Sequence, residues 1–323
     1  MPANQLQYEL WRECNSHCTY CTLGNDNNFT AEKLKLEAMQ TAINEIKTLK
    51  PGLHDALGFI GGEFFQGQLN TQQVKNKFME LMKVSKDALK NKIVNQVWIN
   101  ASLLIGNQKD LYEALDIFEH LDGVWVLTSY DSFGRFHSQK MLENWEFHLK
   151  KIHEEYPEIR TNITTILTGD FVKKYISHEI DLQLFCDKYK STLYLKSPVL
   201  PAHLMNFSKQ EINNRIGYFF PKRKDFLTFL LSFLNREGKE SYENLMSMEL
   251  KAYEVRKNEN SEIGERNLKF IRDKDTLREF FINETGEEVE EPDVCKKGHA
   301  NIYQSYCDSD GCMLCDKLNI LNV

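Results

Sequence analysis

The sequence predicts an α/β fold, built as a partial (β/α)6 barrel with a helical region and a small cysteine-rich C-terminal metal-binding extension. Two observations lead to this prediction. Short β-branched or apolar segments alternate with longer amphipathic segments over residues 1–200, which is typical of a parallel sheet with helices outside it. Beyond Ser197 the pattern changes, and seven of the eight cysteines lie in two clusters near the ends of the chain.

Six strand–helix units make up the predicted barrel. The strands are expected at residues 6–11, 57–60, 94–100, 124–129, 160–167 and 192–196. A first helix is expected after an N-cap at Thr30, and later helices at residues 71–89, 110–120, 138–155 and 171–189. Six units are too few to close an eight-stranded barrel, so we expect an open one. In such folds the chemistry gathers at the C-terminal ends of the strands.

The sequence divides into three regions, and its charge and apolar content limit the class of protein. We expect a barrel core over residues 1–200, a helical region over 201–283 and a cysteine-rich extension over 284–323. The net charge of -7 argues weakly against wholesale binding to nucleic acid, but leaves room for a local basic groove. No apolar run approaches the ~20 residues of a membrane span, and the N-terminus shows no secretory signal. The sequence therefore predicts a cytoplasmic protein without a membrane partner.

The first cysteine cluster is the run Cys14-Asn-Ser-His-Cys18-Thr-Tyr-Cys21, directly after the first predicted strand. Three thiolates from one loop bind three irons of a cubane cluster and leave the fourth iron without a protein ligand. The alternatives are buried free thiols, or half of a zinc site completed by His17. Because tetrahedral zinc sites usually combine two separated ligand pairs, we favour the iron–sulfur site.

The spacing C-x3-C-x-aromatic-C, with Tyr20 before the last cysteine, resembles the signature of the radical S-adenosylmethionine (SAM) superfamily. The resemblance covers roughly residues 6–196 and is most specific at the cysteines. It implies that Cys14, Cys18 and Cys21 hold a catalytic 4Fe-4S cluster, next to Tyr20, whose free iron chelates SAM. One electron then splits SAM into methionine and a 5′-deoxyadenosyl radical, which takes hydrogen from a substrate. The resemblance also implies a reductant such as flavodoxin or ferredoxin.

A glycine-rich turn follows the second predicted strand. Gly61 and Gly62 allow the backbone to approach a neighbour closely, and the Glu63 carboxylate accepts hydrogen bonds from an ammonium. On its own, the tripeptide is more often just a turn. Here it is similar to the superfamily motif that binds the SAM amino group, although Phe64 stands where proline is common.

Polar residues also end the third and fourth predicted strands. Asn100 lies where many relatives carry an Asn-Gly turn. Ser129 and Asp131 lie where the superfamily often places polar groups near the ribose and carboxylate of SAM, and Arg135 is placed to form a salt bridge with that carboxylate. The alternative for each is a polar strand-end or surface residue with no such role.

The second cysteine cluster closes the chain with a C-x2-C pair, which is typical of a metal site. In one interpretation, four thiolates ligate an auxiliary iron–sulfur cluster, similar to the twitch or SPASM extensions of radical SAM enzymes. In the other, His299 joins three of the cysteines in a zinc site and Cys307 stays free. The candidate ligands are Cys295, His299, Cys307, Cys312 and Cys315.

The leading functional hypothesis is therefore SAM cleavage followed by hydrogen abstraction. The substrate is undetermined, and a peptide, a nucleoside or nucleic acid, and a small metabolite all stay open. The alternative is a non-catalytic protein, either an iron–sulfur electron carrier or a zinc-stabilised binding protein. An electron carrier should show no SAM-dependent change in its cluster spectrum.

Overall fold

The computed structural model describes residues 5–11, 13, 14, 16, 18, 30–131, 134–196, 221, 225, 226, 228–242, 245, 281, 282, 288 and 289. These residues fall into two compact units. The first contains the described residues of 1–19, 25–165 and 182–194, and the second contains those of 166–181 and 195–323. The predicted division at residues 200 and 283 stays a prediction.

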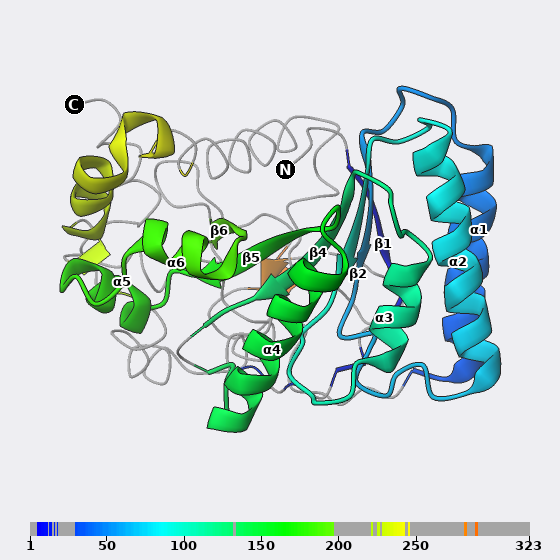
Figure 1. The fold of residues 1–323 in the computed structure, drawn as a ribbon, viewed down its shortest axis with the longest axis horizontal. Helices are drawn as coiled ribbons and strands as arrows, with labels where there is room; N and C mark the ends of the chain where they lie inside the picture. The colour runs from blue at the N-terminus through cyan, green and yellow to red at the C-terminus, as the bar shows by residue number, and fades with distance from the viewer. Residues whose placement is uncertain are drawn as a thin grey trace. The chain divides into compact units, whose positions relative to one another are not determined.

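A six-stranded sheet follows the chain order β1-β2-β3-β4-β5-β6 (Figure 1). Its pairings from β1 to β5 are all parallel. The strands are β1 (Gln5–Glu9), β2 (Ala56–Ile60), β3 (Gln96–Asn100), β4 (Val124–Ser129), β5 (Arg160–Ile166) and β6 (Thr192–Lys196). Two short strands, β7 (Phe281–Ile282) and β8 (Glu288–Val289), form a separate antiparallel pair. The predicted α/β class and parallel strand order are confirmed, whereas curvature into a partial barrel stays a prediction.

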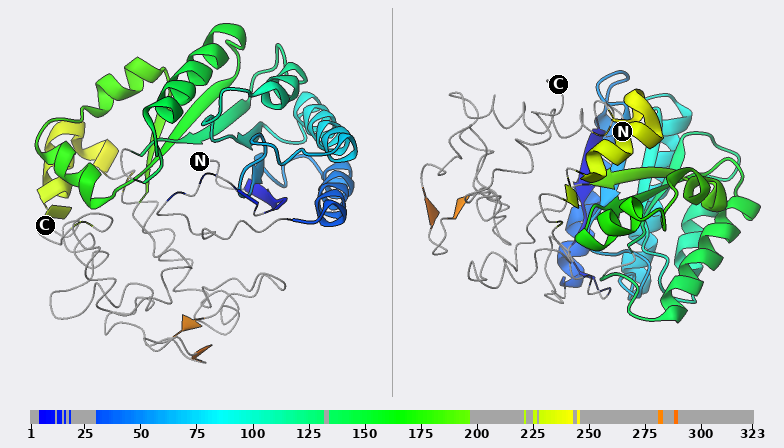
Figure 2. Two further views of the ribbon diagram at one scale, coloured as in Figure 1. Left: turned by 90° about the horizontal axis from the view of Figure 1, so that it is seen from below. Right: turned by 90° about the vertical axis from the view of Figure 1, so that its left-hand side faces the viewer.

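Four helices lie along one face of the sheet (Figure 2). They are α1 (Glu32–Thr48), α2 (Gln72–Lys90), α3 (Lys109–Asp116) and α4 (Gln139–Glu155). The side chains of Thr71 and Ser138 accept N-capping hydrogen bonds at the starts of α2 and α4. The predicted N-cap at Thr30 is wrong: α1 starts after Ala31, which makes no side-chain capping bond.

The single helix expected over residues 171–189 is two helices, α5 (Gly169–Ile176) and α6 (Leu182–Tyr189). The chain leaves α5 through His178, whose φ of 64° lies in the left-handed region. The Glu179 N–H then bonds to the Lys174 carbonyl at 2.9 Å, and the His178 N–H bonds to the Tyr175 carbonyl at 3.2 Å. This pair of bonds is a Schellman motif, which satisfies the last carbonyls of a helix and ends it.

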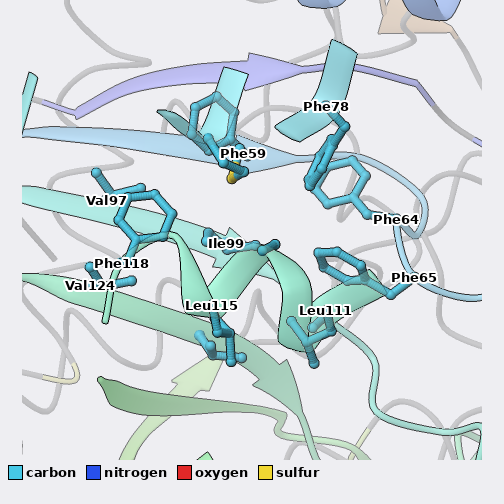
Figure 3. Packing of buried hydrophobic residues seen from close by; sticks show 14 of the residues in the cluster. Phe59, Phe64, Phe65, Phe78, Val97, Ile99, Leu111, Leu115, Phe118 and Val124 are labelled. Carbon is cyan, nitrogen blue, oxygen red and sulfur yellow. The ribbon is translucent and has the colours of Figure 1, made fainter. Parts of the chain in front are cut away.

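The main hydrophobic core lies between the sheet and helices α1 to α4, and Figure 3 shows part of it. Alternate residues of the strands point into it, because side chains of a strand alternate between its faces. The core side chains labelled in Figure 3 are Phe59, Phe64, Phe65, Phe78, Val97, Ile99, Leu111, Leu115, Phe118 and Val124. On the other face Trp98 and Trp125 stack with ring centroids 5.0 Å apart. The core holds the C-terminal ends of β2, β3 and β4 in register.

The second unit has an aromatic cluster of its own. Residues 228–242 are helical, and the phenyl rings of Phe229 and Phe233 on this helix are buried. The Tyr175 hydroxyl donates to Glu237 at 2.7 Å, and the Arg236 guanidinium lies 4.1 Å from the centre of the same ring. Within the described part of the chain, no helix combines the length and apolar character needed to cross a membrane.

Candidate functional site

The glycine-rich turn after β2 is hydrogen-bonded to the segment that precedes the first cysteine. The Gly62 N–H bonds to the Trp11 carbonyl at 2.9 Å, and the Glu63 N–H bonds to the Glu13 carbonyl at 2.9 Å. In return, the Trp11 indole N–H donates to the Glu63 carbonyl at 2.7 Å. The turn therefore fixes the backbone position at which the chain enters Cys14.

Gly61 is required for this contact. A Cβ atom added to Gly61 would lie 2.4 Å from the Trp11 carbonyl oxygen and 3.2 Å from the Phe64 ring. Both neighbours belong to the packed core, so neither can move aside easily. The close backbone approach expected at this motif is thus present, and the neighbour of Gly61 is the protein's own chain.

The Glu63 carboxylate is buried, with 1% of the residue exposed. Its Oε1 atom accepts hydrogen bonds from the backbone N–H groups of Phe64 at 2.9 Å and Phe65 at 3.0 Å. Its Oε2 atom accepts from the Ser102 N–H at 2.8 Å. Because a buried carboxylate is costly unless it is hydrogen-bonded, these three donors stabilise it, and they join the ends of β2 and β3.

Cys14 lies beside this carboxylate. Its sulfur accepts a 3.4 Å hydrogen bond from the Ser16 N–H. Burial raises the pKa of the Cys14 thiol, and the negative charges of Glu63 and Cys18 add to the rise, while the bond from Ser16 opposes it. A bound metal ion favours the thiolate over the thiol and would oppose this rise.

Cys18 lies beside a cation. The residue is buried, and its sulfur is 3.7 Å from Nη1 of the equally buried Arg135. The second terminal nitrogen, Nη2, donates to the Ser102 carbonyl at 3.3 Å. Arg135 follows Gly134, whose φ of 82° turns the chain back after β4. The predicted bond of Arg135 to the SAM carboxylate stays a prediction; the contacts seen are with Cys18 and Ser102.

Four polar residues that the sequence analysis did not select surround the cysteines. The Ser16 hydroxyl donates to Gln66 Oε1 at 3.4 Å, and the Gln66 amide donates to the Ser102 hydroxyl. His137 Nε2 lies 3.1 Å from the Ser16 carbonyl. Gln66 and Ser102 follow the ends of β2 and β3, so position after a strand was the signal for them. Ser16 and His137 had no such signal.

Three further predicted site residues lie at or just beyond the C-terminal ends of β3 and β4. Asn100 and Ser129 are half-buried at the C-terminal ends of β3 and β4, as predicted, and Asp131 is buried just beyond. The structure thus gathers Cys14, Cys18, Glu63 and Arg135 with their polar neighbours. Several candidates lie outside the described residues: His17, Tyr20, Cys21, Cys295, His299, Cys307, Cys312 and Cys315.

The donor chemistry fits an iron–sulfur cluster better than an oxygen-ligated ion. Two of the three thiols of the run are described, both at the end of β1, and thiolates are the usual ligands of such clusters. No group of three or more His, Cys, Asp or Glu side chains with metal-binding geometry occurs among the described residues, which do not include Cys21. The third thiol would complete the set.

Comparison with known proteins supports an iron–sulfur domain. Residues 8–143 match the family model of a 4Fe-4S single cluster domain, and this span includes the N-terminal cysteines, the glycine-rich turn and Arg135. The fold and this match define an α/β protein with a domain similar to 4Fe-4S single cluster domains. No curated protein sequence matches the chain.

Two solved structures are similar at low identity. The crystal structure of Streptococcus suis SuiB bound to S-adenosylmethionine has 13% identity and a TM-score of 0.42, covering 65% of this chain and 45% of that chain. Another crystal structure of SuiB has 13% identity and a TM-score of 0.37, covering 60% of this chain and 39% of that chain. The chain therefore spans less than half of the length of SuiB.

Proposed function

We propose that the protein is a radical SAM enzyme in which Cys14, Cys18 and Cys21 bind a 4Fe-4S cluster that leaves one iron to SAM. When bound and reduced, the cluster supplies the electron that splits SAM into methionine and a 5′-deoxyadenosyl radical. The observation behind the proposal is the hydrogen-bonded junction between the Gly61–Glu63 turn and the segment entering Cys14. This junction lies inside the segment that matches a 4Fe-4S single cluster domain.

The chain's own residues contribute binding and protection. The thiolates of the cysteine run are the iron ligands, and the buried state of Cys18, Glu63 and Arg135 keeps bulk water from that side of the cluster. In the proposal Glu63 also accepts a hydrogen bond from the SAM amino group; its buried, negatively charged carboxylate near the entry to Cys14 supports this role. Arg135 adds positive charge to an otherwise anionic site.

The wider proposal keeps the open points of the sequence analysis. The substrate is a peptide, a nucleoside or nucleic acid, or a small metabolite, and the reductant is a low-potential flavodoxin or ferredoxin. The C-terminal cysteines bind a second centre, either an auxiliary iron–sulfur cluster or zinc. We also propose a cytoplasmic location, where thiols are kept reduced.

The test is anaerobic reconstitution followed by product analysis. Protein with iron and sulfide restored should convert SAM to 5′-deoxyadenosine when dithionite is added. Cys18→Ala and Cys21→Ala should each abolish this reaction, because either change removes a ligand of the cluster. The matched control is Cys186→Ala on α6, which removes a thiol far along the chain from the run and should keep the activity. Undiminished product formation by Cys18→Ala would refute the proposal.

A second candidate function is a non-catalytic electron carrier. One observation favours it: the Glu63 carboxylate already accepts three backbone N–H bonds without any ligand. The discriminating measurement is the EPR spectrum of the reduced cluster with and without SAM. A radical SAM enzyme should show a changed spectrum, because SAM binds the open iron, whereas a carrier with a closed cluster should show none.

A further inference from the structure

Arg135 is a buried cation whose side chain contacts residues that are far from it in the sequence. Only 7% of the residue is exposed, and its Nη1 atom lies 3.7 Å from the sulfur of Cys18, which is 117 residues away in sequence. A buried guanidinium needs acceptors or negative charge nearby. The sulfur of a cysteine supplies both once it is a thiolate, so a metal-bound Cys18 is a better partner for Arg135 than a thiol.

The guanidinium is held in place by a fixed carbonyl. Its Nη2 atom donates to the Ser102 carbonyl, and the same residue is fastened by its N–H to Glu63 and by its hydroxyl to Gln66. Ser102 therefore cannot follow Arg135 if the arginine moves. Because the planar fork of arginine sets the direction of its N–H groups, one fixed acceptor at Nη2 also directs Nη1 at Cys18.

We propose that Arg135 is a positioning residue that acts through Cys18 to raise the reduction potential of the N-terminal cluster. This inference rests on the proposed function in needing that cluster, but it does not need SAM. Reduction adds negative charge, and a cation beside one ligand stabilises the reduced form more than the oxidised form. Hydrogen bonds to cluster sulfurs act in the same direction.

The two described cysteines differ in the charge of the ionisable side chain near them. Cys14 lies near the Glu63 carboxylate, whereas Cys18 lies near the Arg135 guanidinium. Ser102 bonds to both charged groups: its N–H donates to the carboxylate, and its carbonyl accepts from the guanidinium. Removing the positive partner should therefore leave the anionic one unbalanced and make the cluster harder to reduce.

The test is an EPR-monitored redox titration of the full-length reconstituted protein without SAM. For Arg135→Gln, which removes the charge, we expect about a tenfold lower ratio of reduced to oxidised cluster at a fixed potential, or about 59 mV for one electron. Arg135→Lys, which keeps the charge, should recover most of this loss. The control is Lys109→Gln, which removes an exposed charge on α3 and should titrate like wild type.

Each outcome decides the matter. An unchanged potential in Arg135→Gln, or an equal fall in Lys109→Gln, overturns the inference. If the wild-type protein binds the cluster, the proposed function is unaffected by either result. If the wild-type protein binds no cluster after reconstitution, both the inference and the proposed function are overturned. If Arg135→Gln and Arg135→Met both fail to hold a cluster, retention by Arg135→Lys supports the need for charge at Cys18. Loss in all three variants indicates a packing role and overturns the inference.

Discussion

The Lys35 ammonium lies 2.7 Å from Oε2 of Glu13, the residue directly before the first cysteine. The lysine side chain has no solvent exposure, donates a second bond to the Gln68 carbonyl at 2.8 Å, and lies 5.2 Å from the centre of the Trp11 ring. The same Glu13 oxygen accepts the Thr30 N–H at 3.3 Å. The ion pair with the buried Lys35 and the bond from Thr30 thus join the start of the cysteine segment to its end through Glu13.

Lys35→Met should destabilise the protein by about 3 kcal/mol, because breaking a buried pair leaves Glu13 without its cation. The measurement is the free energy of unfolding in urea. Adding Glu13→Gln to the variant should recover part of the loss, since it removes the unbalanced charge. The control is Lys33→Met on the same helix, where 85% of the side chain is exposed. A loss in the control as large as that of Lys35→Met would contradict the prediction.

Gly61→Ala should lower both stability and iron content. The new methyl group would lie 2.4 Å from the Trp11 carbonyl oxygen, so the turn must move away from the cysteine segment. We expect a loss of about 1–3 kcal/mol in unfolding free energy, the usual cost of overpacking. Iron per chain after reconstitution is the second measurement. Gly106→Ala is the control, because its added Cβ has its nearest neighbour at 3.7 Å; equal losses in both variants would refute the explanation.

Glu63→Gln should destabilise the protein even in the absence of SAM. The amide keeps the size of the side chain but turns an NH2 group toward backbone N–H donors, leaving at least one buried donor unpaired. The expected cost is about 1–3 kcal/mol. Urea unfolding of metal-free protein measures it, and calorimetric SAM titration of the loaded protein should show weaker binding. Glu37→Gln on the exposed face of α1 is the control; a stable Glu63→Gln would contradict the structural role.

Stability should fall as the pH drops below about 6.5. Burial lowers the pKa of His148, whose Nε2 lies 2.8 Å from the Ile105 carbonyl and whose Nδ1 lies 2.6 Å from the Tyr112 hydroxyl. Below pH 6.5 or so the unfolded chain binds a proton that the folded chain does not, so the unfolding free energy decreases by up to about 1.4 kcal/mol per pH unit.

His148→Gln should make this pH dependence shallower by up to one proton. Unfolding free energies measured between about pH 5 and 8 give the slope. Burial also lowers the pKa of His153, so part of the slope should persist in the variant. An identical slope in wild type and His148→Gln would contradict the prediction, because it would mean that His148 binds protons equally in the folded and unfolded states.

Periodicity predicted most of the fold. Residues 124–129 and 192–196 have the bounds of β4 and β6, because alternating side chains mark a strand directly. The division of α5 from α6 was missed because α5 ends at Ile176 and the chain turns at His178, with neither glycine nor proline at the turn. The N-cap at Thr30 was wrong because α1 begins one residue later, after Ala31, while the Thr30 N–H bonds to Glu13. Such bonds depend on distant parts of the chain.

The site was predictable in its parts but not in its connections. The Gly61–Glu63 turn and the cysteine run were selected by residue type and spacing, and their junction through Trp11 is now visible. The contact between Arg135 and Cys18 spans 117 residues and depends on how the turn after β4 packs against Ser102. No local pattern encodes a contact of that kind, since it follows from the assembled sheet.

The hydrogen bond between the Thr30 N–H and the Glu13 carboxylate brings together the two ends of the cysteine segment. Bringing together the ends of a chain as long as residues 14–29 costs on the order of 2–3 kcal/mol in conformational entropy. The contacts of Glu13 with Lys35 and Thr30 offset this cost when the polypeptide folds, before any metal binds. Metal loading can therefore follow folding, and iron-free protein should retain the contacts among Glu13, Thr30 and Lys35.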